Sequence, residues 1–530
     1  MATANSNATM RSFLAYGLIP VMLLVILLWA TGAPQLTSLL LALLVGWQSL
    51  GGYLIWRFLR PDSSHLEHFG MGIAIGTATA AIAGLITATA GFGPWGSIVP
   101  TAVVLATHVV KRRRGLETSH PSDRWELSAF AVTIGLGLAV FLYAVRNYPL
   151  RWVGSWTGYH PDMAFFEALA NSLARFGAFE SPFMSGATIK YHWLSYSWTG
   201  QLSVITDAAP FIGITRVLPL VSLAGSTAVI VAWTRRLSGV SWTPLLAGVL
   251  LTLSGFVGAV FGGVLTQDSP SQAMSVLWLL AFTLAVVQSL EQTSDVTLLV
   301  LIAVLGMATT LGKVSAAAPA LAGTVLACAV LLAKRKIGPK KAAIVTAASA
   351  LPIILTFVVF LAGSTGGGGL TFGSLLDRSS SQQGLNPLDG SRGVILGTGL
   401  LVLAVVPRWM GVLQLLIERS WRWRPETWIS LGMASGSVLA LIAFNSFNEI
   451  WFSASTSGPL AATSAVGVGL AVISLQKRNN PPTAAIVGAT AIGAFIISGI
   501  TWWAWSTGAS GGNLFVGTQR WLGPIIAWSG

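Results

Sequence analysis

The sequence predicts an all-α protein, a polytopic bundle of transmembrane helices with about 15 spans and with amphipathic surface helices in one large outward loop. Composition is the first reason, because 54% of the 530 residues are apolar and only 9% are charged, with a mean hydropathy of +0.73. Soluble domains have roughly 25% charged residues, so this chain cannot cover an ordinary aqueous surface. The other reasons are the recurrence of long apolar runs and the gathering of Lys and Arg in alternate connections.

Each expected span is an apolar run that can cross the hydrocarbon core of a bilayer, which takes about 20 helical residues. The first run is longer than the roughly 7–15 apolar residues of a signal peptide, so we expect it to be retained as a span. The expected spans are residues 13–31, 35–57, 69–90, 93–110, 127–145, 213–234, 242–264, 272–290, 296–312, 315–333, 342–362, 393–407, 427–445, 452–474 and 482–503.

The basic residues predict the orientation, because short cytoplasmic connections of membrane proteins are enriched in Lys and Arg. The chain carries 30 Lys and Arg against 17 Asp and Glu, a formal charge of +13. With the N-terminus inside and the C-terminus outside, the cytoplasmic clusters are Arg57 with Arg60, 111–114 with Arg124, Arg235 with Arg236, 334–341, 419–424 and 477–478. This role accounts for the positive charge, so we expect a multi-pass plasma-membrane protein with the lipid bilayer, and no nucleic acid, as its partner.

Five segments follow from this pattern. Residues 1–145 form N-terminal spans, 146–212 an extracytoplasmic loop, 213–362 a transmembrane core, 363–392 a flexible outward loop and 393–530 the C-terminal spans. The loop at 146–212 is expected to carry the chemistry, and the loop at 363–392, rich in Gly, Ser and Gln, suits a mobile flap as well as a plain linker. The single cysteine, Cys328, excludes an intramolecular disulfide and a Cys-cluster metal site.

Two helices are expected in the first outward loop. In residues 162–176 the side chains of Phe165, Phe166, Leu169 and Leu173 lie on one helical face, and Gly177 stops the helix. A second segment, 191–204, carries two tryptophans at interfacial spacing. We expect both helices to lie on the membrane surface.

The few acidic residues divide between the two sides of the membrane. Nine are expected in solvated cytoplasmic connections beside basic residues: Asp62, Glu67, Glu117, Asp123, Glu126, Glu291, Asp295, Glu418 and Glu426. The other eight face outward: Asp162, Glu167, Glu180, Asp207, Asp268, Asp377, Asp389 and Glu449. A reaction centre that uses a carboxylate is therefore expected on the outward side.

The densest polar run is residues 159–202, in which a Tyr-His pair occurs twice. Asp162 follows Pro161 at the start of the expected surface helix, so it suits an N-cap as well as a general base. His160 and His192 are candidate substrate-binding residues, although each could also be an ordinary interfacial histidine. A site of two His and one carboxylate is disfavoured, because the HPD sequence places its His and Asp too close for helical ligand spacing. We assign no metal ligands, and a divalent metal remains a possible cofactor.

The order of motifs in this run resembles the first extracytoplasmic loop of GT-C superfamily glycosyltransferases, polytopic enzymes that transfer a sugar from a polyprenyl-phosphate donor. An Asp is followed by a surface helix, then FESPFMSG at 179–186, then IKYHWLSYSW at 189–198. The similarity continues through RVLPLVSLAGSTAVIVAWTRRLSG at 216–239 and TQDSPSQ at 266–272, and it covers about 125 residues. The segment 213–362 then corresponds to the transmembrane core of these enzymes.

The resemblance implies an inverting glycosyltransferase of the GT-C type, acting on an envelope glycan, lipid or protein. Asp162 corresponds to the acid that orients or deprotonates the acceptor hydroxyl. Lys190, Tyr191 and His192 fall where the family keeps residues that contact the phosphate and line the acceptor site, and Asp268 stands at the second acidic position. The chain departs from the pattern in having no DxD or ExD in this loop, five expected spans before it and no expected soluble domain after the last span. These departures leave metal dependence and acceptor class open.

The proposed chemistry also needs fixed cations at the outer boundary of the membrane, because the leaving group is a lipid phosphate. Lys313, between two expected spans, is a candidate, since an unpaired lysine at membrane depth costs roughly 2.5–3.5 kcal/mol; its alternative role is snorkelling. Arg392 is a second candidate, and its alternative role is that of an interfacial anchor. Other functions compatible with the sequence are a lipid-linked glycan polymerase or ligase, a transporter or flippase, and a scaffold protein of envelope assembly.

Overall fold

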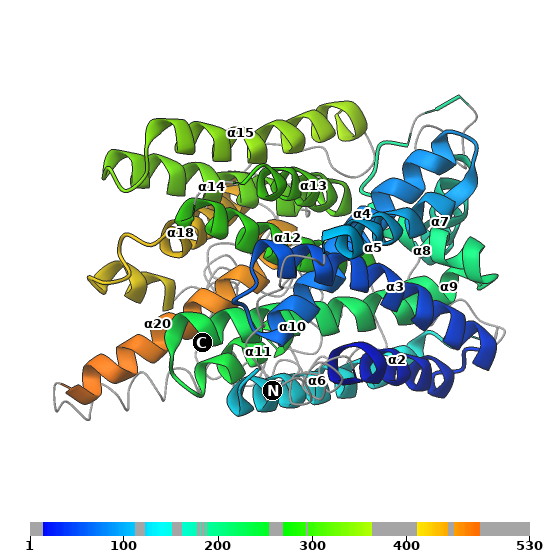
Figure 1. Cartoon of the computed structure of the whole chain (residues 1–530), viewed down its shortest axis with the longest axis horizontal. Coiled ribbons are helices and arrows are strands. Elements are labelled where there is room, and N and C mark those ends of the chain that lie inside the picture. Colours follow the sequence, from blue (N-terminus) through cyan, green and yellow to red (C-terminus); the bar gives the residue numbers. More distant parts are fainter. Residues whose placement is uncertain are drawn as a thin grey trace, which may run out of the picture.

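A computed structural model describes residues 14–111, 122–150, 162–177, 181, 186–187, 189–253, 269–292, 295–362, 411–443 and 450–477 (Figure 1). In these ranges the regular structure is helical and contains no β-strand, so the all-α prediction is confirmed for them. The helices are η1 (Leu14–Leu18), α2 (Ile19–Ala30), α3 (Gln35–Leu59), α4 (His65–Thr89), η2 (Gly93–Ile98), α5 (Val99–Lys111), α6 (Arg124–Ala144), η3 (Val145–Asn147), α7 (Met163–Phe176), α8 (Leu194–Thr206), α9 (Pro210–Ile212), η4 (Gly213–Val217), α10 (Leu218–Ser238), α11 (Thr243–Leu253), α12 (Pro270–Glu291), α13 (Val296–Gly312), α14 (Val314–Ala333), α15 (Pro339–Thr356), η6 (Phe357–Leu361), α18 (Pro425–Ala443), α19 (Ile450–Ser455) and α20 (Ser457–Lys477).

Eight helical stretches of the described part are long and apolar enough to cross a membrane. They are Gln35–Leu59, His65–Thr89, Arg124–Leu142, Pro210–Ser238, Pro270–Glu291, Val314–Ala333, Pro339–Leu361 and Ser457–Gln476. The prediction of about 15 spans is not confirmed. Three further apolar helices are shorter, and the spans expected at 393–407 and 482–503 lie outside the described residues.

The span expected at 93–110 shows why an apolar run need not become a full span. A 3-10 helix, η2, occupies its first six residues and carries Pro94, and α5 has only 13 residues. At a rise of about 1.5 Å per residue, α5 is about 20 Å long, which is less than the roughly 30 Å of the hydrocarbon core.

Two helices, α10 and α12, form the centre of the bundle. Every residue in the most apolar window of α12 is buried, and 94% of the corresponding window around α10 is buried. The two helices pack on each other, α4 and α6 pack on α10, α13 packs on α12, and α20 packs on both. A helix that is apolar on all sides must be enclosed by protein or lipid, and here α12 is enclosed by other helices.

Glycines allow the close approach of α3 and α4. A Cβ atom at Gly76 would lie 2.1 Å from the carbonyl oxygen of Gln48, and one at Gly52 would lie 2.2 Å from that of Gly72. Small residues bring backbones together in this way in membrane helices, where dispersion contacts replace the hydrophobic driving force.

The helix predicted in the first outward loop is confirmed as α7. Its residues Phe166, Leu169 and Leu173 are buried, and Gly177 ends it with a φ of 82° that suits glycine. The prediction that the next helix lies on the membrane surface is wrong. Trp193 and Trp198 at α8 are completely buried, because α8 packs against α7, α4 and α3, and the Trp198 indole donates to Gln48 Oε1 at 2.8 Å.

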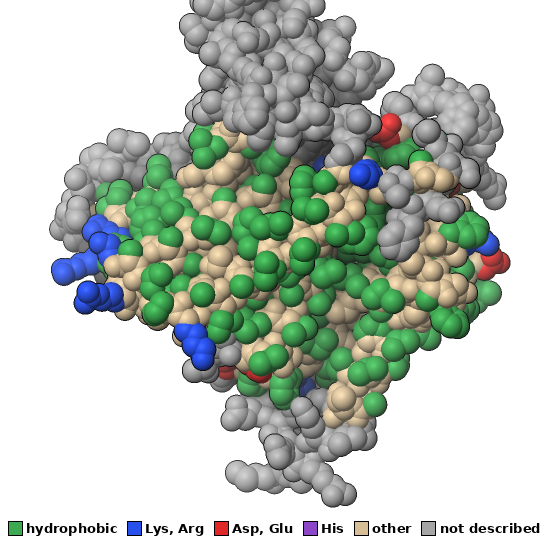
Figure 2. All heavy atoms as spheres, turned by 90° about the horizontal axis from the view of Figure 1, so that it is seen from above, with side chains coloured by type: hydrophobic (Ala, Val, Ile, Leu, Met, Phe, Trp, Pro, Cys, Tyr) green, Lys and Arg blue, Asp and Glu red, His purple; other side chains and the backbone are tan. Residues whose placement is uncertain are grey.

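The outer surface of the bundle is apolar in its middle band. Figure 2 shows hydrophobic side chains spread over this face, with charged side chains gathered toward its edges. Exposed large apolar residues include Leu36, Ile86, Leu351, Leu355 and Val359, on three of the helices that are long enough to span. Such a belt fits the hydrocarbon of a bilayer, so the described helices form a membrane-embedded bundle.

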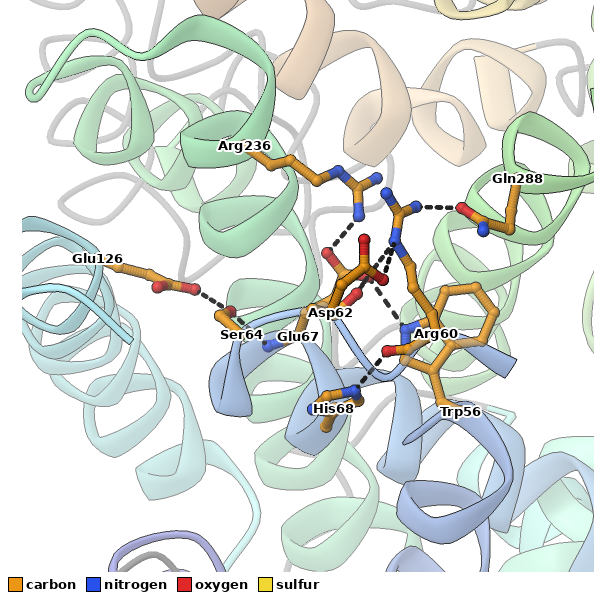
Figure 3. Close-up of polar contacts among 10 residues, drawn as sticks. Trp56, Arg60, Asp62, Ser64, Glu67, His68, Glu126, Arg236 and Gln288 are labelled. Carbon is orange, nitrogen blue, oxygen red and sulfur yellow. Dashed lines mark hydrogen bonds and ion pairs between the residues drawn. The ribbon is translucent and has the colours of Figure 1, made fainter. Parts of the chain in front are cut away.

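Several acids expected in solvated connections are instead buried at one end of the bundle (Figure 3). Glu67, in the first turn of α4, is 1% exposed. Its carboxylate accepts hydrogen bonds from Arg236 Nη1 at 2.5 Å, Ser63 Oγ at 2.8 Å and Trp56 Nε1 at 3.0 Å, and Arg60 Nε lies 4.0 Å away. The prediction of solvation is wrong for Glu67 because a carboxylate with four partners, from α3, α10 and the connection between α3 and α4, no longer needs water.

The same end of the bundle, here called the charged end, joins further helices. Arg60 donates to the Gln288 side chain of α12, and Ser64 at the start of α4 donates to Glu126 of α6 (Figure 3). Asp123, which caps α6, pairs with Arg235 of α10 at 2.5 Å, and Asp123 and Glu126 belong to the connections expected on one side of the membrane. The charged end is therefore defined by Arg60, Glu67, Asp123, Glu126, Arg235 and Arg236.

We predict that Glu67→Gln lowers the thermal unfolding temperature and destabilises the protein by about 3 kcal/mol, because it leaves the facing arginines without a buried counter-charge. Thermal unfolding of the purified protein in detergent measures this change.

The matched control is Asp62→Asn, which removes an exposed carboxylate 3.8 Å from Arg60 Nε. Exposed ion pairs contribute about 0–1 kcal/mol, so this variant should unfold close to the wild type. Equal destabilisation by the two substitutions would show that the charged end does not depend on the burial of Glu67.

Candidate functional site

Lys313 lies in the one-residue break between α13 and α14, outside both helices. α13 ends at Gly312, α14 begins at Val314, and Lys313 has extended backbone angles of φ −162° and ψ 118°. Its residue is only 7% exposed. The chain therefore reverses direction at a lysine whose ammonium group is enclosed by protein.

Two neutral side chains are hydrogen-bonded to this ammonium group. Lys313 Nζ lies 3.1 Å from His192 Nε2 and 3.0 Å from Ser269 Oγ. A charged lysine can only donate, so His192 accepts through Nε2 and carries its proton on Nδ1. Burial, followed by the charge of Lys313, lowers the pKa of His192 well below its ordinary value, which keeps the ring neutral.

Two helix N-termini point at the same position. α12 begins at Pro270, directly after Ser269, and α14 begins at Val314, directly after Lys313. The unsatisfied N–H groups of a helix start carry a partial positive charge, which disfavours a cation and favours an anion. A buried lysine between two such helix starts therefore makes a site of positive potential that an anionic ligand would neutralise.

Asp162 is the charged group that acts on this site from α7. It occupies the N-cap position of α7, but its side chain makes no capping hydrogen bond, so the N-cap role considered from the sequence is wrong. Burial lowers the pKa of Lys313 to about 7, and the negative charge of Asp162 opposes that shift. Asp162 also contributes, after burial, to raising the pKa of Tyr191.

Aromatic rings form one wall of the site. Tyr191 stacks on His192 with ring centroids 3.8 Å apart, and it meets Phe165 of α7 edge-on at 5.2 Å. Tyr196 of α8 stacks on Phe166 at 4.6 Å. These contacts fix the segment between α7 and α8, which holds His192 at Lys313, beside Ser269 at the start of α12.

Lys190 has a different position from its neighbours in the sequence. Its ammonium group is exposed and donates to the Ala362 carbonyl at 2.6 Å, just beyond η6. A cation at the end of a helix complements the negative end of the helix dipole. The structure therefore brings together Asp162, Tyr191, His192 and Lys313, and it places Lys190 on the connection that follows η6.

The remaining predicted site residues, His160, Asp268 and Arg392, lie outside the described residues. Sequence analysis missed Ser269 and Tyr196, which the structure adds to the site. Ser269 could have been found, because a serine directly before a proline marks a helix start, and TQDSPSQ contains that pattern. In the described part of the chain no three His, Cys, Asp or Glu side chains lie close enough together to hold a metal ion.

No protein-family model matches the chain, and no curated protein matches it. The fold is that of a helical membrane protein. The candidate site is built around the buried pair of Lys313 and His192, at the end of the bundle opposite to the charged end.

Proposed function

We propose that this chain is a membrane glycosyltransferase of the GT-C type, which transfers a sugar from a polyprenyl-phosphate donor to a glycan, lipid or protein of the cell envelope. The reaction takes place on the extracytoplasmic face of the plasma membrane. The observation that carries the proposal is the buried Lys313 ammonium group, which two helix N-termini face and to which His192 and Ser269 are hydrogen-bonded.

The donor phosphate is the anion that this arrangement suits. A polyprenyl phosphate reaches the protein from the bilayer, so its phosphate lies at the ends of the spans, where α13 gives way to α14. Lys313 and the N–H groups at the start of α12 bind the phosphate oxygens, and the phosphate in turn keeps Lys313 charged. The same contacts stabilise the negative charge that grows on the phosphate as it leaves.

The transfer is a single displacement. The acceptor hydroxyl oxygen attacks the anomeric carbon, the bond from that carbon to the phosphate oxygen breaks, and the electron pair leaves with the lipid phosphate. Asp162 accepts the proton of the acceptor hydroxyl, which makes an alcohol nucleophilic enough to react. Attack on the face opposite to the leaving phosphate inverts the anomeric configuration.

The proposal includes a topology with the N-terminus inside and the charged end facing the cytoplasm. The contacts of the charged end with one another support it, because connections expected on one side of the membrane meet there. The same contacts weigh against a transporter or flippase. Glu67 lies in the first turn of α4 rather than at mid-span, and arginines pair with it, whereas transported ions need ionisable groups near the bilayer centre.

We predict that Lys313→Met raises the donor dissociation constant by about 10–100-fold, the equivalent of a charged hydrogen bond worth roughly 1.5–3 kcal/mol. The acceptor constant should stay nearly unchanged. Equilibrium binding of the donor and of the acceptor to the purified variant measures both.

The matched control is Lys341→Met, because Lys341 also donates to two neutral oxygens, the carbonyls of Leu290 and Gln292, at 2.8 and 2.6 Å. Lys341 lies at the far end of α12, so this variant should bind donor like the wild type. Unchanged donor binding in Lys313→Met would move the phosphate site away from the α13–α14 break.

Donor binding should depend on pH. The pKa of Lys313 in the empty site is about 7, so its side chain is a charged ammonium group below that pH and a neutral amine above it. Above pH 7 the donor must bring a proton onto Lys313, so its dissociation constant should rise by up to about tenfold per pH unit. His192 stays neutral in this range because its pKa is lowered, and among the described residues Asp162 is the charged group that acts on Lys313. In Lys313→Arg, whose guanidinium does not titrate, a slope that stays as steep would contradict this explanation.

Asp162 and Glu167 should differ in their effect on turnover. Asp162→Asn removes the proposed base and should lower kcat by about 10²–10⁴-fold at saturating donor. Glu167 lies five residues further along the same helix, about 140° around the helix axis from Asp162, so the two side chains cannot both face one site, and Glu167→Gln should keep kcat within about threefold. Turnover of both folded variants tests this, and an equal loss would remove Asp162 from its role as base.

A further inference from the structure

A row of neutral polar side chains continues from Lys313 into the bundle. Gln272 Nε2 donates to Ser455 Oγ at 2.8 Å, and Ser455 Oγ lies 3.1 Å from Ser315 Oγ. Gln272 belongs to the first turn of α12, Ser315 to the first turn of α14, and Ser455 ends α19. Three helices that are far apart in the sequence thus place hydrogen-bonding groups at one position.

The row adjoins the ammonium group directly. Ser315 lies two residues after Lys313, and Gln272 lies three residues after Ser269, which accepts from Lys313. A Cβ atom at Gly312 would lie 2.6 Å from Ser275 Oγ, so the backbone before Lys313 lies against the second turn of α12.

Buried polar atoms in this row have hydrogen-bonding capacity that is not used. Gln272 is completely buried, and its Oε1 has no hydrogen-bond partner in the described part of the protein. The same holds for Ser275 Oγ, which is also completely buried. Burial of an amide oxygen without a hydrogen-bond partner costs free energy. The cost is higher among membrane helices, because no water is present to form the missing hydrogen bond.

Hydroxyl groups of a sugar satisfy such a set, because each hydroxyl both donates and accepts. The row offers one amide and several serine hydroxyls, and these described side chains carry no charge, which suits a neutral ring rather than an amino sugar or a uronic acid. We propose that Gln272, Ser315 and Ser455 bind the hydroxyl groups of a neutral sugar whose phosphate is held at Lys313. This assignment rests on the proposed function and specifies the sugar end of the donor.

Hydrogen bonds between membrane helices can also serve only to hold the helices together. The bond from Trp278 Nε1 to Thr77 Oγ1, at 3.1 Å, is of that kind. Thr77 in turn donates to the Ile73 carbonyl at 2.8 Å, so the polar atoms of this pair are used within the protein. The Gln272 pair differs because its amide oxygen has no partner in the described part of the protein and because the pair lies beside Ser269 and Lys313.

The test is equilibrium binding of two lipids to the purified full-length protein. The probes are undecaprenyl phosphate and the same lipid carrying a mannosyl, glucosyl, galactosyl, arabinosyl or glucuronosyl group. In the wild type a neutral sugar should strengthen binding by about tenfold over the lipid phosphate alone, which is the size expected for one or two net hydrogen bonds, and the glucuronosyl group should not. Gln272→Met should reduce this gain to less than about threefold and leave the affinity for undecaprenyl phosphate unchanged.

Thr77→Val is the matched control, because it removes a hydrogen bond between helices outside the row and should keep the gain from the sugar. Ser315→Ala and Ser455→Ala repeat the test if Gln272→Met does not fold, and each should reduce the gain. An unchanged gain in the folded row variants, an equal loss of both affinities, or a wild type that gains nothing from any neutral sugar would overturn the sugar assignment. Failure of the wild type to bind undecaprenyl phosphate at all would instead overturn the proposed function.

Discussion

This structure depends on one constraint, which is that polar groups inside an apolar bilayer need hydrogen-bond partners from the protein. A bilayer core supplies no hydrogen bonds, so each polar side chain of the bundle must find partners in the protein or lie at an end of the spans. The Trp198 indole of α8 donates to the Gln48 side chain of α3, and the Trp278 indole of α12 donates to Thr77 of α4. The charged side chains with buried partners lie at the two ends of the bundle.

The two ends meet this constraint in different ways. At the charged end Arg60 and Arg236 pair with Glu67, and Arg235 pairs with Asp123, so each of these arginines has a carboxylate partner within the protein. At the other end Lys313 is hydrogen-bonded to a neutral histidine and a serine, the charge of Asp162 acts on it, and the starts of α12 and α14 add positive potential. Balanced charges stabilise a fold without a ligand, whereas a surplus of positive potential is relieved when an anion binds. This difference is the physical reason for proposing that one end stabilises the fold and that the other binds a ligand.

Close packing of α8 against its neighbours fixes the position of His192 at the Lys313 end of the bundle. Its tryptophans are enclosed, and Gln201 of the same helix donates to the Ala81 carbonyl of α4 at 2.9 Å. Gly200 lies so close to Ala170 of α7 that a Cβ atom there would be 1.9 Å from its carbonyl oxygen. His192 therefore projects from a segment anchored in the bundle, which suits a group that must stay within hydrogen-bond distance of Lys313.

The sequence by itself determined the class of protein, because composition and apolar run length depend on the solvent rather than on the fold, and it determined α7, whose apolar period and stop glycine are local signals. It also indicated Asp162, His192 and Lys313 one at a time. Only the tertiary structure decided that His192 and Lys313, 121 residues apart, form a pair, that Lys190 instead reaches Ala362, and that Glu67 and α8 are buried. A polar residue beside a span can be surrounded by water, by lipid or by protein. Which of these surrounds it depends on how helices from distant parts of the chain pack, and a local sequence pattern does not contain that information.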